Sequence, residues 1–445
     1  MKMLRFNRRD FLQYCALLSS GLLAPRGLRA AASASVPHMN WTPAPGSSTI
    51  RFEDITAKSG LDFTTNSCMT PNKNQPETMV GGVGMIDYDN DGYMDLFFVN
   101  GADLPSLKKN DPKYYNRLFH NNRDGTFTDV SEKTGISKVL GKGMGVGLND
   151  YDGDGFIDIF VANDNMPNSL FHNLKGKSFE EVALDVGVAY AETGKAVSGM
   201  GAEFRDLDND GLPDIWHTAT ELETFPLFRN IGNGMFVDVT GKSGLARYTL
   251  EMSGWGNGVG DFDNDGLKDL IVGRGNVLDN ISDFSERTFG EPLSIFRNIG
   301  GMKFEEVSTE KDAANQVRLP YRGVVIGDLF NSGHLDVVTS ALNSKARVLR
   351  NTSTDSNNWI KFQLVGTKSN KMGIGAQLKL TTDDGSTQYD VVSTSAGYQA
   401  SRDPRAHFGL GPFTTAKQLE IKWPSGIHQV VNNLAANKIH KIEEA

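Results

Sequence analysis

A nine-residue acidic pattern recurs five times in this chain of 445 residues, and it constrains the fold more than any other feature. The first copy is "DYDNDGYMD" at residues 87–95, and later copies begin at residues 150, 206, 261 and 328. Successive copies start 63, 56, 55 and 67 residues apart. A period of this length is typical of structural units that pack against their neighbours.

Each copy lies among the same short apolar segments. A Gly-rich stretch such as "GMGVGL" precedes it, and an apolar run such as "DIFVAN" and then "LFHN" or a variant follow. Four units end in a segment such as "FEEV". Short apolar segments bounded by Gly and Asn turns predict strands. Four strands per unit predict an all-β fold, a β-propeller whose innermost strands use Gly because they crowd the central axis.

The two ends of the repeat region complement each other. The fifth unit lacks its final strand after "VLRN" at 348–351, whereas "FEDI" at 52–55 has the sequence of such a strand without a unit of its own. We therefore expect residues 50–56 to supply the outer strand of the last blade. This pairing would close a propeller of five blades and remove an open edge that invites aggregation.

The acidic pattern has the spacing of a calcium loop. Oxygen atoms at positions 1, 3, 5, 7 and 9 can surround one ion, position 7 through its backbone carbonyl, and Gly at position 6 allows the turn. Position 12 is not Glu and both flanks are strands, so this is not an EF-hand, and the ninth residue must complete the site. The predicted ligands are Asp87, Asp89, Asp91, Tyr93 and Asp95; Asp150, Asp152, Asp154, Phe156 and Asp158; Asp206, Asp208, Asp210, Leu212 and Asp214; and Asp261, Asp263, Asp265, Leu267 and Asp269.

Carboxylates at one repeated spacing favour a metal over a solvated turn. An Asp that caps its own backbone explains one Asp-Gly turn. It does not explain four carboxylates in each of four loops, since these would repel one another without a cation. We expect about four Ca²⁺ ions, one for each complete loop. In the fifth loop Phe330 and Ser332 replace the aspartates at positions 3 and 5, so we expect no metal there or weak binding.

The N-terminal residues 1–34 resemble a twin-arginine export signal. Arg8 and Arg9 precede a short apolar stretch at 14–24, and small residues at 32–34 form a plausible cleavage site. The apolar stretch is shorter than the roughly 20 residues that cross a bilayer. We therefore expect a periplasmic or secreted protein that has no stable membrane span after signal removal.

Charge and cysteine content narrow the function further. The signal carries six basic residues against one Asp, so its removal changes the net charge from −9 to −14. A chain this acidic is not expected to bind nucleic acid, because phosphate backbones need a basic face. Cys15 leaves with the signal and Cys68 has no partner, so no internal disulfide can form. Bound metal is then the expected additional source of stability.

The motifs resemble known families. The acidic loops resemble the FG-GAP/VCBS-type repeats of integrin-like propellers, and "PETMVGGVGMIDYDNDG" fits the entry into a first repeat. The segments "NNWIKFQLVGTKSNKMGIGAQLKL", "STSAGYQASRDPRAHFGLG" and "LEIKWPSGIHQVVNNLAANKIHKIEE" resemble the ASPIC/UnbV domain of the cartilage acidic protein family and its bacterial relatives. The resemblance covers nearly all of residues 50–445 and implies an extracytoplasmic calcium-binding protein. It supplies no catalytic residues.

The chain therefore divides into four parts: the signal at 1–34, a linker at 35–49, the propeller at 50–351 and an ASPIC/UnbV domain at 352–445. In the last part, apolar and polar residues alternate in four segments separated by Gly, Asp and Ser turns, which predicts a small β-sandwich. These segments are Trp359–Leu364, Ala376–Leu380, Leu419–Trp423 and Lys438–Ile442.

Whether the chain is an enzyme stays open, and a non-catalytic role is favoured. His120 and His172 could be catalytic, but each aligns with Arg229, Arg297 and Arg350 in the other repeats, and a repeated polar position is more often structural. We assign no catalytic residue and no redox cofactor. The alternative is a calcium-stabilised enzyme that acts on polysaccharide.

The repeats differ most between their second and third strands. Residues 103–117, 220–225 and 274–294 depart from the pattern there. Variable loops on a rigid scaffold often carry binding function, although neutral loop growth would give the same sequences. We expect these loops to bind a protein or glycan partner.

Overall fold

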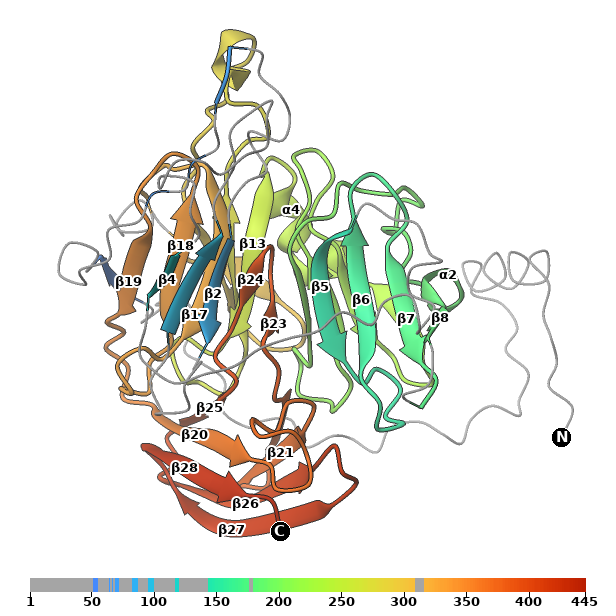
Figure 1. Ribbon diagram of the computed structural model, residues 1–445, viewed down its shortest axis with the longest axis vertical. Coiled ribbons are helices and arrows are strands. Elements are labelled where there is room, and N and C mark those ends of the chain that lie inside the picture. The colour runs from blue at the N-terminus through green and yellow to red at the C-terminus, as the bar shows by residue number, and fades with distance from the viewer. Residues whose placement is uncertain are drawn as a thin grey trace, which may run out of the picture. The chain divides into compact units, whose positions relative to one another are not determined.

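The computed structural model describes residues 51–54, 64, 66, 69–71, 82–86, 95–99, 117–119, 143–175, 179–308 and 316–445. Strands are the main secondary structure of these residues (Figure 1). The helices among them are α2 (Ala183–Val186), α3 (Thr240–Ser243), α4 (Leu245–Thr249) and the 3₁₀ helix η4 (Ile281–Asp283). In this part of the chain, no helix has the length and apolar character needed to cross a bilayer.

Five sheets correspond to the five repeats, and the strands of each repeat pair antiparallel in sequence order. The first contains β2 (Gly82–Ile86), β3 (Asp95–Val99) and β4 (Arg117–Phe119). The second contains β5 (Gly143–Asn149), β6 (Asp158–Asn163), β7 (Ser169–Asn173) and β8 (Phe179–Glu181), which lie side by side in Figure 1. The third contains β9 (Ala202–Arg205), β10 (Asp214–His217), β11 (Leu227–Asn230) and β12 (Phe236–Asp238). The fourth contains β13 (Gly254–Gly260), β14 (Asp269–Arg274), β15 (Ser294–Asn298) and β16 (Phe304–Glu306).

The fifth sheet draws strands from both ends of the repeat region. It contains β17 (Tyr321–Gly327), β18 (Asp336–Ala341), β19 (Arg347–Asn351) and β1 (Phe52–Asp54). Strand β1 pairs antiparallel with β19, and Phe52 lies opposite Asn351. The predicted pairing of the N-terminal strand with the last repeat is therefore present.

The first strands of the repeats contact one another in series: β5 with β9, β9 with β13, β13 with β17, and β17 with β2. Glycines permit this close approach. A Cβ atom on Gly145 would lie 2.0 Å from the carbonyl oxygen of Met200, and one on Gly256 would lie 2.5 Å from that of Arg322. Apolar clusters fill the space between neighbouring sheets, as where Trp216 packs with Val272. The predicted all-β fold is confirmed, and the repeats form a β-propeller.

The C-terminal strands form two further sheets. One has the order β25 (Ala406–Gly411), β20 (Asn358–Val365) and β28 (Lys438–Glu443). The other has the order β22 (Thr387–Val391), β21 (Gln377–Thr382), β26 (Thr415–Lys422) and β27 (His428–Ala435). Both sheets contribute to one buried core that contains Phe362, Leu378 and Trp423. The four predicted segments all form strands of this sandwich, while β22, β25 and β27 were not predicted.

A short hairpin from the C-terminal part enters the propeller, which the sequence did not indicate. Its strands are β23 (Ser395–Ala396) and β24 (Ala400–Ser401), and β24 pairs parallel with β2 (Figure 1). At the tip, Gly397 and Ala202 exchange two backbone hydrogen bonds. The buried ring of Tyr398 packs edge-on against Trp255, with centroids 5.3 Å apart. The hairpin thus lies against the inner strands β2, β5 and β9.

Candidate metal-binding loops

Each acidic pattern connects the first strand of a sheet to the second. The structure describes the second, third, fourth and fifth of these loops. In the first loop Asp87, Asp89, Asp91 and Tyr93 lie outside the described residues, and Asp95 is described only as the backbone start of β3.

The loops share one turn geometry, which the sequence imposes locally. Positions 4 and 6 adopt positive φ angles in every described loop, and Asn and Gly tolerate this conformation best. Position 4 is Gly153 (φ 78°), Asn209 (59°), Asn264 (55°) and Asn331 (53°). Position 6 is Gly155 (95°), Gly211 (87°), Gly266 (90°) and Gly333 (86°). These backbone preferences therefore favour the turn even without a bound cation.

Hydrogen bonds orient the carboxylates inside this turn. The first-position carboxylate accepts the N–H of the sixth residue, as Asp206 does from Gly211 at 2.8 Å and Asp261 from Gly266 at 2.7 Å. The fifth-position carboxylate accepts the N–H of the seventh residue at 2.9 Å, in the donor-acceptor pairs Phe156–Asp154, Leu212–Asp210 and Leu267–Asp265. These bonds face the carboxylates toward the interior of the loop.

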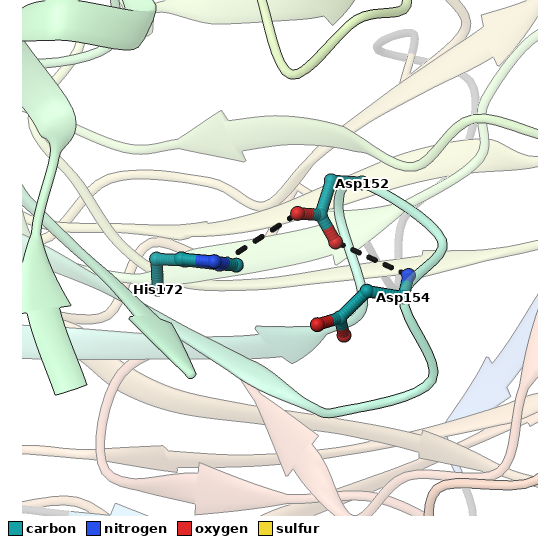
Figure 2. Close-up of side chains that lie close together, drawn as sticks. All are labelled: Asp152, Asp154 and His172. Carbon is teal, nitrogen blue, oxygen red and sulfur yellow. Dashed lines mark hydrogen bonds and ion pairs between the residues drawn. The ribbon is translucent and has the colours of Figure 1, made fainter. Parts of the chain in front are cut away.

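The carboxylates at positions 1, 3 and 5 converge. In the third and fourth loops, one oxygen from each of the three aspartates lies within 4.8 Å of the others. In the second loop Asp150 and Asp152 form such a group with Asp158 at position 9. Asp152 and Asp154 form another with His172, which points toward Asp152 from β7 (Figure 2). The structure thus brings together most of the predicted carboxylate ligands of these loops.

Several carboxylate oxygens in the loops are buried without a hydrogen-bond partner. They are Oδ1 of Asp206 and Asp208 in the third loop and Oδ1 of Asp263 in the fourth. A buried acceptor without a partner is costly, and hard cations such as Ca²⁺ bind carboxylate oxygens. These loops therefore fit a metal ion, and the acidic clusters can hold one.

The electrostatics of the loops point the same way. Burial raises the pKa of Asp206 to about 7. Burial also raises the pKa of Asp265 to about 7, and the adjacent Asp263 carboxylate contributes. For Asp261, burial and then the Asp265 and Asp263 carboxylates raise the pKa well above its usual value. The loops therefore favour a positive charge, whether a proton or a metal cation, near neutral pH.

A basic side chain from the third strand faces positions 3 and 5. Arg229 contacts Asp208 at 2.7 Å and Asp210 at 2.9 Å. Arg297 contacts Asp263 and Asp265, both at 2.8 Å. His172 takes this place in the second loop, with Nδ1 3.7 Å from Asp152 and 3.3 Å from Asp158. The structure thus gives the repeated position of His172 a role beside the loop carboxylates. His120 lies outside the described residues.

The ninth-position aspartate links the loop to two backbone segments. In the fourth loop Asp269 accepts the N–H of Phe262 at 3.1 Å and that of Asn298 at 2.8 Å. Asp158, Asp214 and Asp336 make the equivalent pairs of bonds. This residue therefore fixes the loop against the third strand, in addition to any contact with a metal.

In the third, fourth and fifth repeats, the asparagine that ends the third strand links neighbouring repeats. Its side-chain amide donates to the carbonyl of the second loop residue in the preceding repeat. The pairs are Asn230 to Tyr151 at 2.9 Å, Asn298 to Leu207 at 3.0 Å and Asn351 to Phe262 at 2.9 Å. The "RN" of the third and fourth repeats therefore combines an arginine that contacts the loop carboxylates with an asparagine that bonds to the neighbouring repeat.

The C-terminal sandwich contacts these loops, and no sequence pattern predicts these contacts. Gln377 donates to Asp150 at 2.6 Å, and Lys422 lies 3.9 Å from the same carboxylate. Asn357 donates to the carbonyl of Asp263 at 2.8 Å. In the fifth loop Asp328 lies 2.8 Å from Lys361. Burial alone would raise the pKa of Asp328, but the Lys361 ammonium and two backbone N–H groups hold it below its usual value.

Comparison with known proteins agrees with this architecture. A family model described as ASPIC and UnbV matches residues 366–445, and one for FG-GAP-like repeats matches residues 87–158 and 150–217. The chain is 27% identical to cartilage acidic protein 1 of Xenopus tropicalis over 349 residues, which is 74% of this chain and 40% of that protein. Parts of this chain thus match the FG-GAP-like repeat and the ASPIC and UnbV family models, and the chain is homologous to cartilage acidic protein 1.

A further relative and two solved structures are also similar to this chain. Identity to cartilage acidic protein 1 of Mus musculus is 25% over 422 residues, covering 82% of this chain and 64% of that protein. The chain thus spans less than two thirds of the length of these relatives. An Agrocybe aegerita lectin that recognises terminal N-acetylglucosamine is 14% identical, with a TM-score of 0.29, over 61% of this chain and 66% of the lectin. The Dos1 propeller is 10% identical, with a TM-score of 0.25, over 64% of this chain and 68% of the Dos1 chain.

Proposed function

We propose that this protein is an exported calcium-binding β-propeller of five blades that acts as a non-catalytic binding module. The observation that carries the proposal is the repeated convergence of three carboxylates in one turn geometry, with buried oxygens that lack a hydrogen-bond partner. Carboxylate oxygens around a flexible turn favour Ca²⁺ over smaller or softer cations. Bound calcium would neutralise the clustered charge, and the predicted ligands of the first four loops would hold it.

Calcium binding is tested by titration of the mature chain. Isothermal titration calorimetry should detect about four ions by the tally of complete loops. Chelation should lower the thermal midpoint, because an ion that binds only the folded state stabilises it by mass action. A titration that detects no ion, with equal midpoints in chelator and in millimolar calcium, would contradict the proposal.

The binding surface is proposed at the three variable loops between second and third strands (103–117, 220–225 and 274–294), which lie at the strand ends opposite to the acidic loops. The last two of these loops are described, and they contact each other: Glu221 accepts from Asn276 at 3.0 Å and pairs with Arg287 at 2.6 Å. Leu222 and Phe284 expose 67% and 61% of their surfaces there. Leu222 also has a positive φ of 71°, a strained conformation of the kind found at binding sites.

The partner is sought with a glycan array and a cross-linking pull-down, using the mature chain and two matched variants. Leu222→Ser with Phe284→Ser should abolish binding, because exposed apolar side chains supply much of the affinity of a small surface. Leu184→Ser on α2 is the control, since Leu184 is also 61% exposed but lies in another element. Equal binding by all three proteins would place the partner elsewhere.

We expect export before metal loading, and the way the loops are held supports this order. Backbone turns, the ninth-position aspartate and the inter-repeat asparagines fix the loops through hydrogen bonds that need no metal. A twin-arginine substrate folds before it crosses the membrane, and cytosolic calcium is too low for sites of extracellular affinity. Replacing Arg8 and Arg9 by Lys should trap folded precursor in the cytoplasm, whereas Asp263→Asn should leave export intact. Fractionation of both variants checks this, and retention of Asp263→Asn would contradict it.

A further inference from the structure

The fifth loop keeps the part of the geometry that presents its first carboxylate. Asp328 accepts the N–H groups of Ser332 and Gly333, both at 2.8 Å. In the fourth loop Asp261 accepts the equivalent groups of Asp265 and Gly266 at 3.0 and 2.7 Å. The position-1 carboxylate is therefore held in the same way in both loops, and what differs is the positive charge beside it.

That positive charge comes from the C-terminal sandwich. Lys361 of β20 places Nζ 2.8 Å from Oδ2 of Asp328, and both side chains are 0% exposed. The backbone carbonyl of Asp328 accepts from Arg405 at 3.2 Å, and Arg405 also donates to Asn331 at 2.6 Å. One ring nitrogen of His407 lies 3.0 Å from the carbonyl oxygen of Gly333. Three residues of the loop thus contact β20 and β25 or the residue just before β25.

The residues at positions 3 and 5 of the fifth loop leave a negative charge that one positive charge can balance. Phe330 and Ser332 remove two carboxylates, so one carboxylate remains among positions 1, 3 and 5. Arg350, which aligns with Arg297, has its guanidinium 4.8 Å from the centre of the Phe330 ring. A buried charge is stable only when a partner balances it. One ammonium balances one carboxylate here, whereas the fourth loop carries three.

We propose that Lys361 occupies the cation position of the fifth loop permanently, and that this loop is the metal-independent docking site of the C-terminal sandwich on the propeller. The proposal rests on the proposed calcium function in one respect: the contrast with the other loops assumes that those loops bind calcium. It implies that calcium removal affects the complete loops, while the contact between propeller and sandwich at the fifth loop persists.

The first experiment is a double-mutant cycle in the full mature chain. Lys361→Met and Asp328→Asn should each lower the thermal midpoint and speed hydrogen exchange in residues 328–336 and 358–365, because each leaves one buried charge unpaired. The double variant should recover most of both losses. Lys379→Met is the control, since Lys379 pairs with Glu420 at the surface and both are about 40% exposed. Losses that simply add in the double variant would overturn the proposal.

The same cycle is run in chelator to separate the two proposals. Exchange in residues 328–336 should not respond to chelator in the unmodified chain. Chelator should shift the midpoints of the unmodified chain and of Lys361→Met equally. Faster exchange at this loop in chelator alone would show that a metal holds it, and would overturn the proposal. A chelator shift of zero in both proteins would instead contradict the calcium function and leave the cycle to decide the role of Lys361.

A second experiment converts the loop. Phe330→Asp with Ser332→Asp restores the acidic pattern, and we expect no additional calcium ion by calorimetry while Lys361 is present. Adding Lys361→Met should allow one more ion than the unmodified chain binds. An additional ion in the presence of Lys361 would overturn the proposal. If the converted loop prevents folding, the cycle above still decides the question.

Discussion

The fourth and fifth loops of the propeller have the same backbone but different charge. Both have Asp at positions 1 and 9, Asn at position 4 and Gly at position 6. At positions 3 and 5 the fourth loop has Asp263 and Asp265, and the fifth has Phe330 and Ser332. The residues that build the turn are therefore separate from the residues that supply charge to it. A repeat can lose the aspartates at positions 3 and 5 and keep its place in the propeller.

The contact that the aligned arginine makes depends on the residue at position 3 of the loop. Arg297 pairs with the carboxylates of the fourth loop, while Arg350 stacks on Phe330 in the fifth. The same side chain thus neutralises charge in one loop and covers an aromatic ring in the other. Its aligned position alone does not determine its role, because the role depends on the loop beneath it.

The largest effect is expected from the residue that both loops share at position 9. Asp269→Ala and Asp336→Ala should each lower the free energy of unfolding by about 3–5 kcal/mol, since each removes two buried hydrogen bonds to a carboxylate. The losses should be similar in the two loops and should persist in chelator, as measured by urea denaturation. If only Asp269→Ala destabilises the protein, or if its effect requires calcium, position 9 acts through the metal and the two loops do not share a scaffold.

The second effect concerns the charge that distinguishes the loops. Asp263→Asn should reduce the calcium count by one ion. It should also lower the calcium-dependent part of the free energy of unfolding by about 2.7 kcal/mol when free calcium is 100-fold above Kd. Phe330→Ala at the matching position should change neither quantity. Calorimetry and thermal midpoints with and without calcium measure both. A calcium count that falls with Phe330→Ala would mean that the fifth loop also binds the ion.

The sequence predicted the features that repeat and missed those that do not. Strand order, the converging aspartates and the pairing of residues 52–54 with the last repeat all follow from patterns that recur along the chain. The role of position 9 in linking backbone segments was not apparent, because a carboxylate in a calcium-type pattern is expected to be a ligand. Its hydrogen bonds appear only once the third strand lies beside the loop.

The contacts of the C-terminal sandwich were beyond prediction for a physical reason. Alternation in "NWIKFQLV" places Lys361 on the polar side of β20, which ordinarily faces solvent. Lys361 is nevertheless fully buried, because that side of the strand faces the fifth loop. The tip of the hairpin contacts the propeller through Tyr398, which bridges to Gly145. No local pattern encodes such pairings between distant segments.

The smallest effect is expected from Arg350, the aligned arginine of the fifth loop, which contacts an aromatic ring instead of carboxylates. Arg350 is exposed and its guanidinium lies over the Phe330 ring, so Arg350→Ala should cost about 0.5–1 kcal/mol. Phe330→Leu removes the ring and should cost a similar amount. Because the two substitutions break one contact, the double variant should lose no more than either single variant. Urea denaturation of the four proteins in chelator measures this cycle. Losses that add would mean that Arg350 acts independently of position 3, and the contrast with Arg297 would then reflect differences between the strands rather than between the loops.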